Sequence, residues 1–316
     1  MEQQIGMTKV FVQGRYVKSV KEIKKLISTD HSLNWVNEDD ISLADLVLYF
    51  DSLPKKNEKK LNLNKILIRQ EPEIILPKNY KPSKLKDFVK VISVGASKYS
   101  TFGINWPQDF KSTNFQNSIR EQSKGVMVNS NLISLHKNEF YSLRREVLCK
   151  SSEIDLYGKR WNITFTKKLQ LLFSEIKLML KYPFSFKVKG MRYFFKNPKN
   201  YFGEIEDKFQ IMTRYKFAII IENSDNYVSE KLFDAFVSGC IPVYVGPSLE
   251  NFDIPESLYI KAEPNFDSIN RAVQIAKSID YANWLQSLNN WMSQPTTIYD
   301  WSKETFLKRL KDIIEL

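Results

Sequence analysis

Apolar and polar positions follow one another most regularly in residues 215–247, which read as strand, polar loop, helix and strand. Residues 216–221 form a short apolar run, as expected for a buried parallel strand. Ser229 is a candidate helix cap, and four apolar side chains follow it at helical spacing. Gly239 is expected to end this helix, because glycine readily adopts the conformation that terminates helices. A second apolar strand is predicted at 240–245.

The polar loop of this unit lies where open α/β sheets bind ligands. Such ligands lie beyond the carboxyl ends of parallel strands, beside helix N-termini whose free N–H groups favour phosphate. The same loop position is also polar in βαβ units that bind nothing, so the pattern alone leaves a purely structural role open. The loop and the first helical turn carry five polar side chains of interest: Glu222, Asn223, Tyr227, Glu230 and Lys231.

The rest of the chain repeats the alternation of strand and helix, which predicts an α/β protein. Further strands are expected at 44–50, 65–69, 90–95, 125–130 and 153–158, and helices at 17–27, 140–147, 267–279, 281–291 and 302–314. The polar residues 111–124 are interpreted as a linker. Two domains are therefore predicted, at 1–124 and 125–316, with the last helices free to return to the first domain.

Composition and charge narrow the classes of protein. The chain has 316 residues, 43% of them hydrophobic, which is enough for two packed domains. It has no apolar run of 18 residues and no secretory layout at its start, so no spanning helix or leader is expected. Two isolated cysteines do not form a disulfide framework and favour a cytoplasmic protein. The net charge of +11 suits nucleic acid, an anionic membrane or a nucleotide sugar as partner.

The positive charge is concentrated in one segment. Residues 166–199 contain nine Lys or Arg and a single acid, Glu175. Within this segment an amphipathic helix is predicted, which would lie on an anionic membrane, a localisation peripheral to the inner membrane. The alternative is a surface helix whose apolar face packs on the protein core. The apolar face consists of Leu169, Leu172, Phe173, Ile176 and Leu180. This distribution favours the membrane over nucleic acid as the partner of the basic charge.

Several strings resemble the signature of glycosyltransferase family 10, the α-1,3/1,4-fucosyltransferases, in its bacterial form. The core YKF, ENS and YVSEK strings at residues 215–231, followed by IPVYVG, match in order and spacing. Weaker similarity runs from 44 to 279, apart from an insertion at about 163–200. The family implies a GT-B arrangement, in which two Rossmann-like domains face each other across a cleft. The first would bind the acceptor and the second the nucleotide-sugar donor.

The resemblance also assigns roles to single residues. EPEIILPKNY resembles a segment whose first glutamate is the proposed catalytic base, which implies Glu71, with Glu73 as a second candidate. The pyrophosphate-binding arginine of the family is replaced here by Lys137, so bidentate recognition is lost and Arg144 or Arg145 is needed to compensate. The other implied donor-binding residues are Glu222, Asn223, Tyr227, Glu230 and Lys231.

The implied activity is an inverting transfer of L-fucose from GDP-fucose to a bacterial surface glycan, such as a lipopolysaccharide O-antigen or a capsule precursor. No cofactor or essential metal is expected, because the sequence has no Asp-x-Asp motif and only two histidines. Two alternatives remain. One is the same fold with another nucleotide-activated deoxysugar, and the other is a non-catalytic protein that binds a glycan or a membrane.

Overall fold

The chain forms two compact units in the computed structural model. The first contains residues 1–109 and 299–316, and the second contains residues 110–298. The structure describes residues 8–16, 20–21, 23–25, 28, 33–35, 41–93, 120–121, 123–181, 193–252, 254–294, 308, 310–312 and 314. Each unit has its own hydrophobic core and its own five-stranded parallel sheet.

The first unit is built on a sheet of order β2-β1-β3-β4-β5. Every pair of neighbouring strands is parallel, with Val12 opposite Leu48 and Leu48 opposite Ile66. Its strands are β1 (Thr8–Gly14), β2 (Leu33–Trp35), β3 (Leu46–Phe50), β4 (Asn64–Arg69) and β5 (Lys90–Ser93). Short helical turns join them: η1 (Ile41–Leu43), η2 (Glu58–Lys60), η3 (Pro77–Tyr80) and α2 (Pro82–Leu85).

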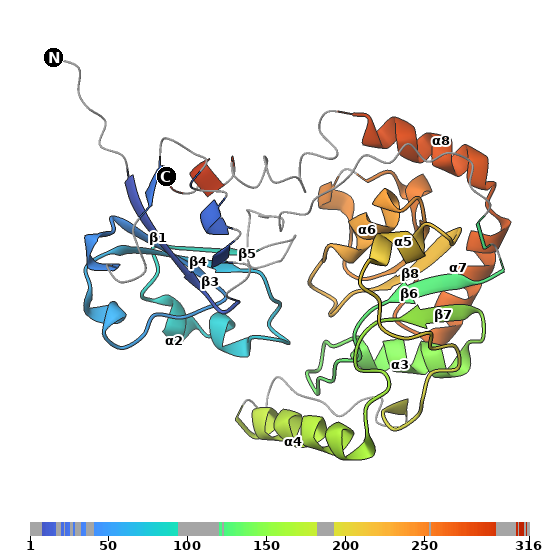
Figure 1. The fold of residues 1–316 in the computed structure, drawn as a ribbon, viewed down its shortest axis with the longest axis horizontal. Coiled ribbons are helices and arrows are strands. Elements are labelled where there is room, and N and C mark those ends of the chain that lie inside the picture. The colour runs from blue at the N-terminus through green and yellow to red at the C-terminus, as the bar shows by residue number, and fades with distance from the viewer. Residues whose placement is uncertain are drawn as a thin grey trace. The chain divides into compact units, whose positions relative to one another are not determined.

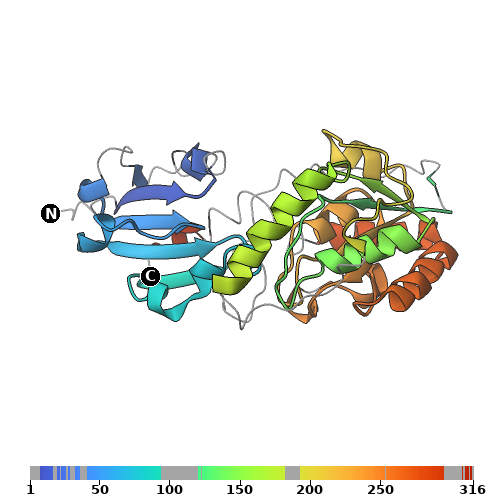
Figure 2. The same ribbon diagram turned by 90° about the horizontal axis from the view of Figure 1, so that it is seen from below.

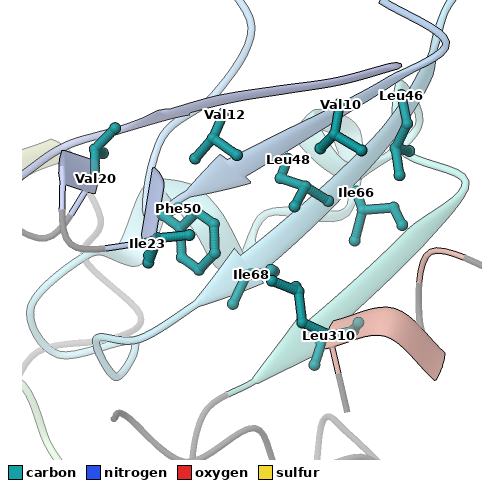
Figure 3. Packing of buried hydrophobic residues seen from close by; sticks show 11 residues of the cluster. Val10, Val12, Val20, Ile23, Leu46, Leu48, Phe50, Ile66, Ile68 and Leu310 are labelled. Carbon is teal, nitrogen blue, oxygen red and sulfur yellow. The ribbon is translucent and has the colours of Figure 1, made fainter. Parts of the chain in front are cut away.

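Apolar side chains cover both faces of this sheet, as near-continuous apolar strands require. On one face Phe50 lies beside Ile23, which comes from the helical residues after β1, and Val10, Leu48 and Ile68 belong to the same cluster (Figure 3). Leu310, from the far end of the chain, closes the same cluster and is 1% exposed. Leu310 is therefore part of the first unit's core.

The second unit has a sheet of order β10-β9-β8-β6-β7, which is also parallel throughout. Its strands are β6 (Gly125–Val128), β7 (Ile154–Tyr157), β8 (Phe217–Ile221), β9 (Ile241–Val245) and β10 (Ile260–Lys261). Its helices are α3 (Tyr141–Lys150), α4 (Phe165–Lys181), α5 (Lys208–Met212), α6 (Lys231–Val237), η6 (Glu250–Phe252), η7 (Glu256–Leu258), α7 (Phe266–Ser278) and α8 (Tyr281–Met292). In Figure 1, α5 and α6 lie on one face of the sheet, and α3 and α7 lie on the other.

Lys216, just before β8, connects the sheet to α7. Its side chain is buried, and Nζ donates to the carbonyls of Lys277 and Ile279, each 2.7 Å away. The last carbonyls of a helix have no partner within the helix, so a cation is well placed to bind them. Lys216 therefore caps the C-terminal end of α7 and fixes it against β8.

The predicted α/β pattern is confirmed, with differences at several boundaries. The strand and helix predicted after residue 216 are β8 and α6, and Gly239 ends the turn with a φ of 66°. Ser229 lies one residue before the N-cap Glu230, so the helix begins later than predicted. Strands β1, β2 and β10 were not predicted from the sequence pattern. Only parts of the predicted elements at 17–27, 90–95 and 302–314 fall within the described residues.

The division between the units also differs from the predicted boundary at 124/125. Arg120 Nη1 donates to the carbonyls of Tyr215 and Ser238, and the chain at Glu121 pairs with that at Tyr215. The end of the predicted linker thus packs on the second unit. Residues 299–316 are grouped with the first unit. Most of the predicted linker lies outside the described residues.

The predicted amphipathic helix is α4, on the outside of the second unit beyond α3 (Figures 1 and 2). Its apolar face is not part of the core. Phe173 is 61% exposed and Leu180 is 73% exposed, and no apolar side chain of α4 is fully buried. Among the described residues, no helix has the length and apolar character needed to cross a membrane.

Candidate functional site

The ends of three neighbouring strands bring polar side chains together in the first unit. Strands β1, β3 and β4 are parallel and adjacent, so the residues that follow them meet at one edge of the sheet. Tyr16 follows β1, Asp51 follows β3 and Glu71 follows β4. The hydroxyl of Tyr16 donates to Oε1 of the half-buried Glu71 at 3.2 Å. This edge therefore holds the carboxylate that the sequence analysis named as a base.

Asp51 fixes the backbone that carries Glu71. Its Oδ1 accepts the N–H groups of Gln70 at 2.8 Å and Glu71 at 3.2 Å. Asp51 is 3% exposed, and its φ of 50° is in the left-handed region that side chains rarely adopt. Burial raises the pKa of Asp51 to about 7, against the opposing effect of the two N–H donors. Asp51, whose backbone is strained, thus positions the turn after β4 through its buried carboxyl group.

Two aromatic residues complete this edge. The hydroxyl of Tyr80 donates to the carbonyl of Glu71 at 2.9 Å, and the guanidinium of Arg69 lies 4.2 Å from the centre of the Tyr80 ring. Burial, followed by the charge of Glu71, raises the pKa of Tyr16 to about 12, so its hydroxyl stays protonated as a donor. Glu73, the second candidate base, is also half-buried.

In the second unit, Glu222 is the buried centre of the loop between β8 and α6. Its side chain is 0% exposed, Oε1 accepts the N–H of Ser229 at 3.0 Å, and Oε2 accepts the Ser229 hydroxyl at 2.6 Å. Burial raises the pKa of Glu222, while Lys231 and the Ser229 hydrogen bonds oppose the rise. Glu222 therefore supports the loop, one of the ordinary structural roles for a polar residue at this place.

Arg144 joins the same loop to α3. It is 2% exposed, and its Nε donates to the carbonyl of Ile221 at 3.0 Å while Nη2 donates to Oδ1 of Asn223 at 2.9 Å. Burial lowers the pKa of Arg144, and nearby Tyr141 and Glu222 oppose the fall. The guanidinium thus holds Asn223 and the end of β8. These contacts use the Nε and Nη2 donors, so this side of the guanidinium is already occupied by the protein.

Charged side chains gather at the start of α6. The Nζ of Lys231 donates to the Ser229 hydroxyl at 2.9 Å, which links it to Glu222. Glu230 is half-buried beside it, and its pKa is lowered because Lys231, Lys208 and Arg144 outweigh the effect of burial. Lys208 also forms an ion pair with Asp234, whose pKa burial raises to about 6. The start of α6 therefore carries a fixed cluster of positive and negative charges.

The loop that carries Lys137 runs beside this cluster. The backbone of Glu139 pairs with that of Ser224, and the N–H of Phe140 donates to the carbonyl of Asn223 at 3.0 Å. Lys137 is exposed, whereas His136 is 3% exposed, and burial followed by the charge of Lys137 lowers its pKa to about 4. His136 is therefore neutral at pH 7, and it accepts the N–H of Asn138 at 3.2 Å through Nδ1.

The structure brings together most residues predicted for the donor side. Asn223, Tyr227, Glu230 and Lys231 lie half-buried on one loop and helix start, and Lys137 lies on the adjacent loop. Arg145, the other compensating arginine, instead donates to the carbonyl of Leu132 at 2.7 Å. Within the described part of the chain, no group of three or more His, Cys, Asp or Glu side chains could hold a metal ion.

The comparisons with known proteins concern this same region. Residues 192–311 match the family model described as glycosyltransferase family 10 (fucosyltransferase), C-terminal part. This part of the chain is similar to the C-terminal part of glycosyltransferase family 10. It includes β8, α6 and β9 with the Glu222, Ser229 and Lys231 cluster. The predicted resemblance is therefore confirmed for residues 192–311.

A curated relative and several solved structures extend the likeness. The mouse 4-galactosyl-N-acetylglucosaminide 3-alpha-L-fucosyltransferase 9 is 40% identical over 98 residues, which is 28% of this chain and 27% of that protein. An α1,3-fucosyltransferase crystal structure covers 98% of this chain and 90% of its own, with 15% identity and a TM-score of 0.56. The same enzyme has been solved with GDP-fucose, with a TM-score of 0.53.

Anabaena Alr3699/HepE, solved with UDP and glucose, has a TM-score of 0.57 at 9% identity and covers 98% of this chain and 99% of its own. Together these structures confirm the predicted GT-B fold class of two α/β units with parallel sheets. At such identities they show the fold alone. The chain spans about a quarter of the length of the curated relatives that it matches.

Three residues that shape the candidate site were not predicted. Asp51 directly follows a strand, so the rule that ligands gather at carboxyl strand ends was enough to suggest it. Tyr16 follows a strand that the sequence analysis missed, so no comparable signal was available. Ser229 was expected to cap a helix, but its hydroxyl lies between Glu222 and Lys231.

Proposed function

We propose that the protein is an inverting fucosyltransferase that moves L-fucose from GDP-fucose to a hydroxyl group of a bacterial surface glycan. The observation that carries the proposal is the Lys231, Ser229 and Glu222 cluster, which lies inside the segment that matches family 10. The acceptor we propose is a lipopolysaccharide O-antigen or a capsule precursor on the cytoplasmic side of the inner membrane.

The second unit is proposed to bind the donor. Lys231 is a half-buried cation whose Nζ is held in place by Ser229, so little side-chain entropy is lost when it contacts a diphosphate. Lys137, on the adjacent loop, would supply a second charge. Tyr227 and Glu230 are proposed to contact the nucleoside, while Arg144, Asn223 and Glu222 hold the loop. Charge-assisted contacts to the leaving diphosphate stabilise the charge that develops there.

Glu71 is proposed as the general base. In a single inverting displacement, the acceptor oxygen forms a bond to the anomeric carbon of fucose as the bond to the GDP phosphate oxygen breaks. The acceptor proton passes to a Glu71 oxygen, and GDP leaves with the bonding electrons. Tyr16 and Asp51 orient that carboxylate through its side chain and its backbone. Neither a covalent enzyme intermediate nor a bound metal is needed for this step.

The second candidate function is the transfer of a sugar from a different nucleotide-sugar donor. HepE shares the fold and was solved with UDP and glucose, so the fold itself accommodates more than one nucleotide sugar. Lys137, in place of the arginine that the family resemblance leads one to expect, is the feature of this chain that favours another nucleotide-activated deoxysugar. A non-catalytic protein that binds glycan or membrane would not need the elaborate support of Glu71.

Calorimetry and a donor panel test the proposal. The full chain is titrated with GDP, UDP, CMP and dTDP, and GDP is expected to bind most tightly. Release of the sugar from GDP-fucose and from other nucleotide-activated deoxysugars is then compared, with and without glycan acceptors. Tighter binding of UDP than of GDP, together with turnover of a UDP-sugar, would favour the second candidate. No turnover of any donor would leave the non-catalytic alternative.

A further inference from the structure

The outer face of α4 carries an apolar stripe that the protein core leaves uncovered. Its side chains recur at intervals of four, four, three and four residues, so they lie along one side of the helix. We define the α4 stripe by five residues: Phe165, Leu169, Phe173, Ile176 and Leu180. Phe165, Phe173 and Leu180 are 62%, 61% and 73% exposed, and the other two are half-buried.

The stripe is extended by an aromatic residue from a different segment. Phe195 is 40% exposed, and its ring centre lies 5.2 Å from that of Phe165. The neighbouring Phe194 is 2% exposed and packs under the guanidinium of Arg145, which anchors this segment to α3. Two adjacent phenylalanines therefore have opposite roles, one in the core and one continuing the apolar surface.

The exposed charged side chains of α4 are all positive. Glu175, the single acid in residues 166–199, turns toward the body of the unit, where its carboxylate accepts the N–H of Leu135 at 3.1 Å. Lys168 also turns inward and donates to Oδ1 of Asn197 at 3.4 Å. Lys167, Lys177 and Lys181 are exposed. Among the described residues, the outer surface of α4 is therefore apolar and positive, without a carboxylate.

We propose that the α4 stripe docks the enzyme on an anionic phospholipid surface. The apolar side chains would enter the boundary between headgroups and acyl chains, and the lysines would contact phosphate groups. The charge distinguishes between possible occupants, because the exposed lysines of α4, which are Lys167, Lys177 and Lys181, complement a negatively charged sheet of lipid better than a second copy of this chain, whose net charge is +11. This inference does not depend on the proposed transfer reaction.

Flotation with vesicles tests the proposal on the full chain. Phosphatidylcholine vesicles with and without phosphatidylglycerol are compared at low and high salt, because salt screens contacts between exposed charges and headgroups. We expect the protein to float with the anionic vesicles at low salt and to be released from them at high salt. Failure to float with anionic vesicles at low salt would overturn the proposal.

Variants locate the contact and separate it from the general attraction of a basic protein. Phe173→Ser combined with Leu180→Ser should reduce binding to anionic vesicles at least tenfold, because two exposed apolar side chains are lost. Lys177→Glu combined with Lys181→Glu should reduce it at least as much, at about fivefold for each lysine removed. Ile275→Ser, at a side chain that is 52% exposed on α7, is the matched control and should bind like the wild type.

The same variants distinguish the other occupants of the stripe. Thermal unfolding should be unchanged in the double serine variant, because both side chains are exposed. If the wild type is a dimer that becomes a monomer in this variant and neither binds vesicles, a second copy covers the stripe and the proposal is wrong. Equal vesicle binding by the wild type and the double serine variant would also overturn it.

Discussion

Glu71 receives more support than an ordinary surface glutamate. Tyr16 binds its carboxylate, Tyr80 binds its carbonyl, and Asp51 binds its N–H. Glu71→Gln should lower kcat by about two to four orders of magnitude, the usual contribution of a general base. The dissociation constant of GDP, measured by calorimetry, should stay nearly the same. Glu73→Gln is the matched control and should turn over normally; the reverse result would transfer the role of base to Glu73.

Asp51 should give the first unit an unusual dependence on pH. Its pKa in the folded protein is about 7, above the ordinary value of 3.8. The folded state therefore holds the proton more tightly, and this group's contribution to stability decreases as pH rises from about 4 to 7, by up to about 1.4 kcal/mol per unit. Chemical unfolding at several pH values should show this loss in the wild type.

Asp51→Asn is the variant that tests this prediction. The amide keeps an oxygen that can accept from Gln70 and Glu71 but removes the titrating group. The variant should therefore lose stability less steeply than the wild type over the same pH range. Identical slopes for the two proteins would show that Asp51 does not titrate in this range.

Lys231 should contribute directly to donor binding. Lys231→Ala is expected to weaken GDP binding by about 10- to 100-fold, because a charge-assisted phosphate contact contributes about 1.5–3 kcal/mol. Lys277→Ala is the control, since that lysine pairs with Glu153 on a different part of the unit. An unchanged GDP dissociation constant in Lys231→Ala would remove this residue from the site.

At the level of elements, the position of α7 depends on Lys216, which belongs to the YKF string of the family resemblance. We expect Lys216 to have no part in the reaction. Lys216→Met should destabilise the protein by about 1–3 kcal/mol, because two partly buried carbonyls at the end of α7 lose their donor. Chemical unfolding measures this loss. The dissociation constant of GDP should change less than twofold, in contrast to Lys231→Ala. A large loss of GDP affinity without loss of stability would assign Lys216 to the site instead.

The contrast between Lys216 and Lys231 shows what the sequence alone could and could not predict. Both lysines are part of the recognisable string, and both strands and the helix of that string were predicted within one or two residues. Whether a lysine caps a neighbouring helix or contacts a ligand depends on α7, which lies some sixty positions away in the chain. Periodicity describes a single element and does not report such distant contacts.

Short strands also could not be predicted from the sequence pattern. Strand β10 has two residues and β2 has three, too few to establish an alternation. Strand β1 alternates poorly, because Val10, Phe11 and Val12 are all buried between two apolar faces. Because β1 was not predicted, Tyr16, which follows β1 and contacts Glu71, was not predicted as a site residue either.

For the molecule as a whole, the sequence predicts a reaction without a metal. Addition of EDTA should leave the rate of fucose transfer within about twofold of its value without chelator, because cationic side chains are proposed to neutralise the diphosphate. The rate is measured before and after chelation, and then again with Mg²⁺ or Mn²⁺ restored. Complete loss that the metal reverses would reveal an ion site, and the description of the donor contacts would need to include it.

Leu310 sets an order of events for the newly made chain. N-terminal domains commonly fold first during synthesis, while the rest of the chain is still being translated. Here the sheet of the first unit packs against Leu310, which belongs to the same cluster as Val10 and Ile68 and follows the second unit in the chain. A nascent chain held on the ribosome would therefore expose part of this sheet until Leu310 has been synthesised. The second unit, complete by residue 298, has no such delay, so the ribosome-bound protein is expected to fold from its later half first.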